Sequence, residues 1–183
     1  MIIILTQCFP SRIGGIENLM FNLSFSLSKD NKVLVLADQH NFIKDAVFDK
    51  KFKNKFLIRR FSGIKYFRRR NKARELEKII NFGQVKVIIC DSWKSLEIPS
   101  KKLKNKNVPL ICLAHGNELI IKNNSHHNRI LNTLENVTKI VANSEFTKKL
   151  IKKVNPKLTN IEVIHPGVSS FENIIEEEVK LIE

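Results

Sequence analysis

Four short motifs carry residue types that can contact an anion or a sugar hydroxyl. They read Phe9-Pro10-x-x-x-Gly14-Gly15-x-Glu17, His115-Gly116-Asn117-Glu118, Asn143-Ser144-Glu145-Phe146-Thr147 and His165-Pro166-Gly167-Val168. Each motif follows an apolar segment typical of a buried strand. Ligands of an open α/β sheet bind beyond the carboxyl ends of its strands, so these residues are the first candidates for a binding site.

The glycine pair Gly14-Gly15 precedes a predicted helix. The first turn of a helix presents unpaired N–H groups and the positive end of the helix dipole. Such a turn accepts a phosphate, and glycine lets the phosphate approach the backbone closely. The pair lacks the GxGxxG pattern and the P-loop lysine, so a tight turn without a ligand is the alternative. Its position after the first strand, with Glu17 following, favours the binding interpretation.

His115 ends a buried strand and precedes Gly116, so its side chain is expected to face the cleft. A neutral imidazole would hydrogen-bond a sugar hydroxyl, and an imidazolium would pair with phosphate. A structural role is the alternative for a lone histidine. Glu118 would either accept a hydroxyl proton or cap the helix that follows.

Asn143 and Ser144 stand at a strand-to-helix turn, where capping and phosphate binding use the same N–H groups. The sequence leaves both roles open. Trp93, near another strand end, would stack on a sugar or nucleobase, or pack in the core. His126 and His127 lack a third ligand at a metal-binding spacing, so no metal site is predicted.

Seven apolar segments are predicted strands, at residues 2–6, 33–37, 56–61, 85–90, 109–114, 139–142 and 161–164. Helical spacing predicts helices at 16–27, 73–80, 130–137 and 146–154, and a short lysine-rich helix after residue 93. This alternation predicts an α/β fold, a Rossmann-like doubly wound parallel sheet with helices on both faces. The domain is expected to span residues 1–168. The acidic residues 169–183 are expected to form a linker or a terminal helix.

The chain has no apolar run near the roughly 18 residues that span a bilayer, and its first residues lack the features of a signal peptide. A cytoplasmic protein is therefore expected. Cys8, Cys90 and Cys112 occur singly, without a CxxC pair, and are interpreted as small buried hydrophobes. A reactive thiol is the alternative.

The net charge is +14, and residues 50–74 contain twelve Lys or Arg and no acidic residue. A cationic surface of this density attracts polyanions such as anionic lipid headgroups. Arg68, Arg69 and Arg70 are predicted to contact a membrane surface, together with aromatic residues of the same segment. A generally basic proteome is the alternative. Nucleic-acid binding is not favoured, because the chain has no helix-turn-helix, RNP-like or zinc-finger pattern.

The joint order of the four motifs resembles the N-terminal half of a GT-B glycosyltransferase of the retaining GT4 family, from Ile2 to about Val168. The resemblance implies that Gly14, Gly15 and Glu17 contact donor phosphates or the acceptor, and that His115 contacts the transferred sugar. Asn143 and Ser144 would form the family's Asn-Ser turn. Gly167 would belong to the motif before the interdomain linker, in which Ser169 replaces the usual Asp.

In this family the N-terminal domain binds the acceptor, and a C-terminal domain with no counterpart here binds the nucleotide sugar. The resemblance therefore implies a catalytically incomplete half. Its partners would be a donor-binding domain or subunit, a nucleotide sugar such as UDP- or GDP-hexose, and a lipid-linked or envelope glycan acceptor. Transfer would need no metal and no other cofactor, and would occur at the inner membrane face. The alternative is a non-catalytic module that docks on anionic lipid or on a partner protein.

Overall fold

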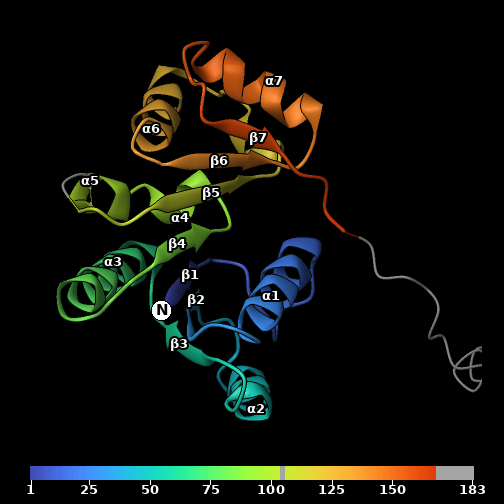
Figure 1. Cartoon of the computed structure of the whole chain (residues 1–183), viewed down its shortest axis with the longest axis vertical. Coiled ribbons are helices and arrows are strands. Elements are labelled where there is room, and N and C mark those ends of the chain that lie inside the picture. Colours follow the sequence, from blue (N-terminus) through green and yellow to red (C-terminus); the bar gives the residue numbers. More distant parts are fainter. Residues whose placement is uncertain (104–105, 168–183) are drawn as a thin grey trace, which may run out of the picture.

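The computed structural model describes residues 1–103 and 106–167, which form one parallel sheet flanked by helices (Figure 1). Its strands are β1 (Ile2–Leu5), β2 (Val33–Asp38), β3 (Leu57–Phe61), β4 (Val87–Cys90), β5 (Leu110–Ala114), β6 (Lys139–Ala142) and β7 (Ile161–Val163). The order is β3-β2-β1-β4-β5-β6-β7, and every neighbouring pair is parallel. The predicted strands and the doubly wound fold are confirmed.

Helices cover both faces of this sheet. They are α1 (Gly15–Leu27), α2 (Phe42–Phe52), α3 (Lys65–Phe82), α4 (Trp93–Leu96), α5 (Pro99–Leu103), α6 (Asn124–Leu134) and α7 (Glu145–Val154), with a 3₁₀ turn, η1, at Asn117–Leu119. Figure 1 shows α1 and α2 on one side of the sheet and α3 to α6 on the other. Helix α7 places Ile151 and Val154 in the same core as α3 to α6.

The first strand shows why its sequence is a continuous apolar run. Ile2 and Ile4 belong to the core beneath α1 and α2, whereas Ile3 and Leu5 belong to the core on the opposite face. A strand covered on both faces has no side that favours polar residues. The apolar run Ile2 to Leu5 thus indicates a strand in the centre of the sheet.

Helix α2 was not predicted from the sequence. Its residues Phe42, Ile43 and Val47 are 76%, 73% and 67% exposed, whereas Asp45 is only 1% exposed. Helix prediction depends on an apolar stripe that faces the core and a polar stripe that faces water. Because α2 departs from this arrangement on both faces, the pattern that would reveal it is absent.

Part of the sheet lacks a helical cover within the described residues. On the face that carries α1, no helix in residues 1–103 or 106–167 packs over Ile111, Val141 and Ile164, which instead line a hollow beside α1. The acidic segment predicted at 169–183 lies outside the described residues, as does Val168. None of the described helices is both long and apolar enough to cross a lipid bilayer.

Candidate functional site

The strand order reverses between β1 and β4, and a buried carboxylate joins these two strand ends. Asp91 directly follows β4 and is 2% exposed. Its Oδ2 accepts hydrogen bonds from the Thr6 hydroxyl and the Gln7 N–H, both at 2.8 Å, and its Oδ1 accepts from the Ser95 hydroxyl at 2.5 Å. Asp91 therefore fixes the loop after β1 against β4, at the place where doubly wound folds bind ligands.

Asp91 was not among the predicted site residues. The available sequence signal was a single acidic residue immediately after the apolar strand 85–90. That signal does not show which groups the carboxylate meets, because Thr6 and Gln7 are more than 80 positions away along the chain.

His115 is held at the end of β5 by main-chain contacts. Its Nε2 lies 2.9 Å from the Asp91 carbonyl oxygen. A carbonyl oxygen can only accept, so Nε2 carries the proton, and Nδ1 is the lone-pair nitrogen of the neutral ring. The His115 N–H donates to Glu118 Oε1 at 2.7 Å. Glu118 thus folds back onto the backbone. It does not cap the following helix α6, whose N-cap is Asn123, and its proposed role toward a hydroxyl proton stays a prediction.

Gly116 is required by the backbone that turns away from His115. Its φ is +109°, a conformation that L side chains rarely adopt. A Cβ there would also stand 3.2 Å from Thr147 Oγ1. The His-Gly pair therefore brings the end of β5 close to α7.

The Asn143-Ser144 turn is a helix cap tied to the His115 segment. Ser144 Oγ accepts the Thr147 N–H at 3.2 Å, as an N-cap does. The Thr147 hydroxyl donates to Asn143 Oδ1 at 2.6 Å, and Asn143 Nδ2 donates to the His115 carbonyl at 3.4 Å. The capping role is confirmed, and phosphate binding by the same turn stays a prediction.

Glu17 occupies the space beside the glycine loop. Its side chain is 5% exposed, and its Oε1 lies 3.1 Å from Nε of Arg12. A Cβ on Gly14 would overlap Glu17 Oε2, whereas a Cβ on Gly15 would meet nothing within 4 Å. Gly14 is thus needed for the position of this carboxylate, which lies near the helix start where a phosphate was predicted to bind.

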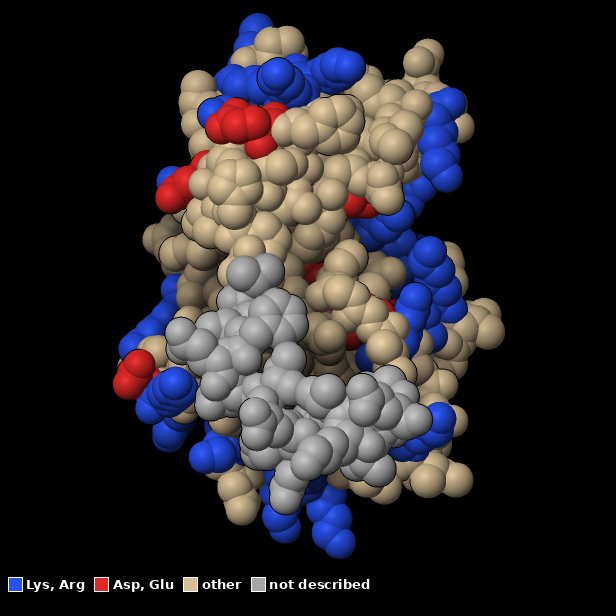
Figure 2. Space-filling view, turned by 90° about the vertical axis from the view of Figure 1, so that its right-hand side faces the viewer, with Lys and Arg blue, Asp and Glu red and all other residues tan. Residues whose placement is uncertain are grey.

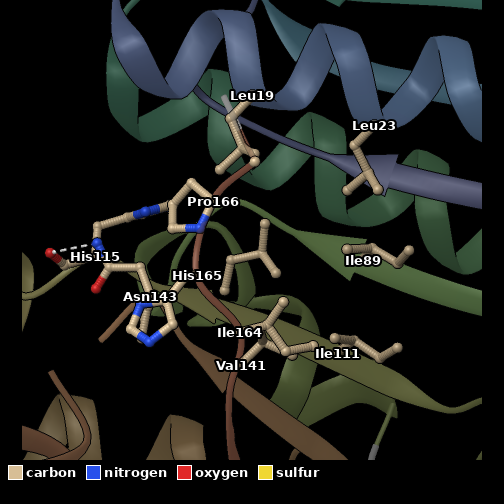
Figure 3. A pocket seen from close by; sticks show the side chains of 13 residues that line it. Leu19, Leu23, Ile89, Ile111, His115, Val141, Asn143, Ile164, His165 and Pro166 are labelled. Carbon is tan, nitrogen blue, oxygen red and sulfur yellow. Dashed lines mark hydrogen bonds between the residues drawn. The ribbon is translucent and has the colours of Figure 1, made fainter. Parts of the chain in front are cut away.

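A hollow of about 320 Å³ opens at the carboxyl edge of the sheet (Figure 3). Leu19 and Leu23 of α1 lie on one side, and apolar residues of β4 to β6 form its floor. His115, Asn143 and His165 supply polar groups. An apolar surface with a few convergent polar groups is typical of small-molecule sites, and it would suit the mixed faces of a sugar ring.

The structure brings together only part of the predicted site. His115, Asn143 and Gly167 line this hollow, while Gly14, Gly15, Glu17, Ser144 and Glu118 are not among its lining residues. Trp93 is 1% exposed, and its Nε1 donates to the Glu118 carbonyl at 2.8 Å, so it is a core residue. Helix α6 begins at Asn124 after the cap Asn123, so His126 and His127 lie in its first turn.

The cationic segment 50–74 is less exposed than its sequence suggests. Among the described residues, acidic side chains form ion pairs with five of its twelve cations, namely Arg59, Arg60, Arg68, Arg69 and Lys72. Arg68 pairs with Asp38 at 2.9 Å and Arg69 with Glu97 at 2.6 Å. Arg70 lies over the Tyr66 ring at 3.5 Å. The contact of Arg68, Arg69 and Arg70 with a membrane stays a prediction. Arg68 and Arg69 already form ion pairs with carboxylates of this chain.

Lys and Arg side chains nevertheless dominate the charged surface. Figure 2 shows them at the margins of one face, at both ends of the molecule, with fewer acidic side chains between them. The middle of this face is largely uncharged where the described residues are visible. A net charge of +14 makes the whole surface attractive to anions.

In the described part of the chain, the metal-ligating side chains are scattered, and Cys8 and Cys90 have raised pKa values. Residues 1–103 and 106–167 hold no group of three His, Cys, Asp or Glu side chains placed to bind a metal. Burial, with Asp91 nearby, raises the pKa of Cys8 to about 11. Burial also raises the pKa of Cys90. Both thiols therefore stay protonated near neutral pH. Cys90 and Cys112 are buried as predicted, whereas Cys8 is only partly buried.

One protein-family model matches most of this chain. The model of Glycosyltransferase Family 4 matches residues 13–170, which include the glycine loop, His115 and the Asn143-Ser144 turn. A search of curated proteins finds no match.

Solved structures share the fold at low sequence identity. HepE of Anabaena, in complex with UDP and glucose, has a TM-score of 0.68 and 13% identity, over 99% of this chain and 50% of that protein. The UDP-GlcNAc 2-epimerase of Methanocaldococcus jannaschii has a TM-score of 0.60 and 13% identity, with 90% and 45% covered. A UGT transferase from Siraitia grosvenorii in complex with UDP has a TM-score of 0.58 and 10% identity, with 98% and 54% covered. The chain thus spans about half the length of these proteins.

Proposed function

Because the chain belongs to glycosyltransferase family 4, we propose that it is the N-terminal, acceptor-binding half of a retaining glycosyltransferase. The reaction would move a hexose from a nucleotide sugar, such as UDP- or GDP-hexose, to a hydroxyl of the acceptor. The nucleoside diphosphate leaves, and the anomeric configuration is retained. The acceptor would be a lipid-linked or envelope glycan at the cytoplasmic face of the membrane.

The observation that carries this proposal is the hollow at the carboxyl edge, where His115 and Asn143 meet an apolar floor. The sugar ring would pack on that floor, and its hydroxyls would bond to the polar groups. His115 keeps Nε2 on the Asp91 carbonyl. Nδ1 is then the ring nitrogen left to accept a proton from a sugar hydroxyl.

The donor side is proposed to come from a second domain or subunit. The chain spans about half of each structure compared above. Electrostatic stabilisation of the departing group is commonly the largest catalytic contribution. In this proposal the cations that stabilise the departing diphosphate belong to the donor-binding half, so residues 1–183 alone do not turn over.

A reconstituted transfer assay tests the role of His115. The purified chain is added to the soluble fraction of source cells depleted of this protein, with labelled nucleotide sugar and total membrane lipid. The wild type is expected to restore transfer to lipid, and His115→Ala to lower the restored rate by about tenfold or more, as expected for a lost hydrogen bond in the reacting complex. His126→Ala is the matched control, because His126 does not line the hollow.

Equal restoration by wild type and His115→Ala would contradict the enzymatic proposal. It would instead favour the non-catalytic alternative, in which the chain docks on lipid or on a partner protein. Thermal unfolding of both histidine variants by circular dichroism shows whether each is folded at the assay temperature.

A further inference from the structure

A second hollow, of about 560 Å³, lies between the loop before α1, the first turns of α1, and α2. Three large apolar side chains on its border are mostly exposed, namely Ile13 at 94%, Ile43 at 73% and Val47 at 67%. Phe42, 76% exposed, adjoins Ile43 in sequence. These four residues, together with Arg12, Lys44 and Lys51, are called the α2 surface below.

Single exposed apolar residues are ordinary on protein surfaces, but several gathered around one depression indicate a binding surface. The depression continues inward to Phe21, Phe48 and Phe52. Phe21 and Phe52 have ring centroids 4.8 Å apart, so they form a packed aromatic floor. The α2 surface is therefore an apolar rim over an apolar base, and not a set of unrelated side chains.

The same hollow is bordered by cations. Arg12, Lys44 and Lys51 all line it. Within residues 1–103 and 106–167, neither Lys44 nor Lys51 forms an ion pair with an acidic side chain, and Arg12 pairs with Glu17. The charge at the rim is therefore positive, and the complementary partner is anionic.

We propose that the α2 surface docks on a bilayer that contains anionic phospholipids. Ile13, Phe42, Ile43 and Val47 enter the boundary between headgroups and acyl chains, and Lys44 and Lys51 reach the phosphates. Lysine is depleted from the cores of protein–protein interfaces. Apolar residues interleaved with lysine are instead typical of helices that lie in a membrane interface, where the lysine stem packs on apolar surface and the ammonium stays at the headgroups.

The position of the surface fits an acceptor that is carried by a lipid. Helices α1 and α2 follow the carboxyl ends of β1 and β2, so their first turns lie at the same edge of the sheet as His115. Docking there brings the bilayer to the edge that holds the sugar-binding hollow. The inference rests on the proposed function in one respect only: a lipid-carried acceptor explains why this edge of the sheet would approach a membrane.

Vesicle co-sedimentation of the purified chain tests the inference without sugar or nucleotide. The wild type is expected to bind vesicles of phosphatidylcholine with 30% phosphatidylglycerol (roughly the anionic content of an anionic leaflet) and to leave pure phosphatidylcholine vesicles largely unbound. Ile43→Ser/Val47→Ser should weaken binding by about tenfold or more, since the inserted groups contribute in proportion to their buried CH₂ groups. Lys44→Glu/Lys51→Glu should weaken it comparably at low salt.

Phe82→Ser is the matched control, because Phe82 is 91% exposed but lies at the far end of α3. It should bind vesicles as the wild type does. All these side chains are exposed, so unchanged thermal unfolding is expected and shows that binding losses are local.

Two results would overturn the inference. One is binding to anionic vesicles that Ile43→Ser/Val47→Ser leaves unchanged, which would mean that charge elsewhere holds the chain. The other is a self-association, seen by sedimentation equilibrium, that this variant abolishes while vesicle binding persists, which would assign the surface to a second copy. His115→Ala should keep full vesicle binding, so failure of the sugar-transfer proposal and failure of this one are separable.

Discussion

At the residue scale, polar side chains at the carboxyl edge are fixed by main-chain atoms as well as by one another. The His115 ring bonds to the Asp91 carbonyl, and Glu118 accepts from the His115 N–H. The buried Lys72 donates to the Thr6 carbonyl at 2.6 Å and pairs with Asp38. Burial lowers the pKa of Lys72, against the opposing effect of Asp38. The fold of the loops, together with contacts between side chains such as Ser95–Asp91 and Thr147–Asn143, therefore sets the geometry of the site.

Replacing Gly14 tests the position of Glu17. Gly14→Ala should displace the Glu17 carboxylate and lower the free energy of unfolding by about 1 kcal/mol, the typical effect of a point substitution. Gly15→Ala should leave stability unchanged or raise it slightly, because its Cβ meets nothing within 4 Å and alanine favours helix. Urea unfolding of the two variants measures the difference.

A double-mutant cycle then isolates the contact itself. In a Glu17→Ala background the overlap disappears, so Gly14→Ala should become nearly neutral. An effect of Gly14→Ala that is the same with and without the Glu17 side chain would contradict this account of the glycine.

The motifs placed His115 and Asn143 at the carboxyl edge of the sheet, where both line the hollow, because residues after buried strands must meet at one edge of a parallel sheet. They did not separate groups that line the hollow from groups that support it. Glu17, Glu118 and Ser144 are directed to the backbone or to neighbouring loop side chains. Those orientations depend on loop conformations that residue spacing does not specify.

At the element scale, a buried ion-pair cluster attaches α2 to the sheet. The Arg60 side chain on β3 is 6% exposed and lies 3.3 Å from Asp45 and 2.7 Å from Asp49. It also donates to the Pro10 carbonyl. The inner side of α2 is thus held by charge as well as by Phe48 and Phe52, which explains why its outer side need not be polar.

Arg60→Ala should lower the free energy of unfolding by about 3–5 kcal/mol, because it removes the cation that faces the buried Asp45 carboxylate and leaves it only neutral donors from Ser11, His40 and Asn41. Arg59→Ala is the matched control on the same strand. The Arg59 side chain is 54% exposed, and its pair with Glu75 should contribute about 0–1 kcal/mol. Comparable losses in the two variants, measured by urea unfolding, would show that the Arg60 cluster does not hold α2.

Glu97 joins three helices and makes stability depend on pH. Burial raises its pKa, but hydrogen bonds from Arg129 of α6 and Arg69 of α3 outweigh burial and lower the pKa to about 2, from the usual 4.5. The folded state therefore gains stability from this group above pH 4.5. That gain is lost as the pH falls from 4.5 toward 2, where the folded protein takes up the proton.

Glu97→Gln isolates this contribution. The difference in unfolding free energy between wild type and variant should be largest above pH 4.5 and shrink as the pH approaches 2. Urea unfolding across pH 2.5–6 measures it, and subtraction removes the titration of other carboxylates. A difference that stays constant over this range would mean that the Arg69–Glu97–Arg129 cluster does not stabilise the fold electrostatically.

All seven strands could be predicted. Burial on both faces leaves a continuous apolar run in central strands such as Ile2 to Leu5, whereas the edge strands β3 and β7 are only partly buried and include charged residues. The amphipathic helix α7 was equally clear, since Ile151 and Val154 face the core while Lys152 and Lys153 follow its outer side. Helix α2 was missed because its apolar residues Phe42, Ile43 and Val47 are exposed, whereas Asp45 is buried against Arg60, which lies on a strand farther along the chain.

At the scale of the whole molecule, the distribution of exposed charge could be predicted only in part from the sequence. The run 50–74 indicated one exposed cationic segment, yet Lys72 and Arg60 are buried in ion pairs. Pairing partners such as Asp38 and Asp45 precede the segment and come into contact only through the sheet and α2. The sequence therefore predicted an anionic partner, whereas the structure points to the α2 surface as the place to meet it.

The central claim is that this chain supplies the acceptor side of a glycosyltransferase and needs a donor-binding half. The most direct measurement is sugar transfer by the purified chain alone, with labelled UDP- and GDP-hexoses and total membrane lipid. We predict a rate equal to that of the protein-free reaction. Sustained turnover by the chain alone, abolished by His115→Ala, would contradict the claim and show that these residues contain a complete active site.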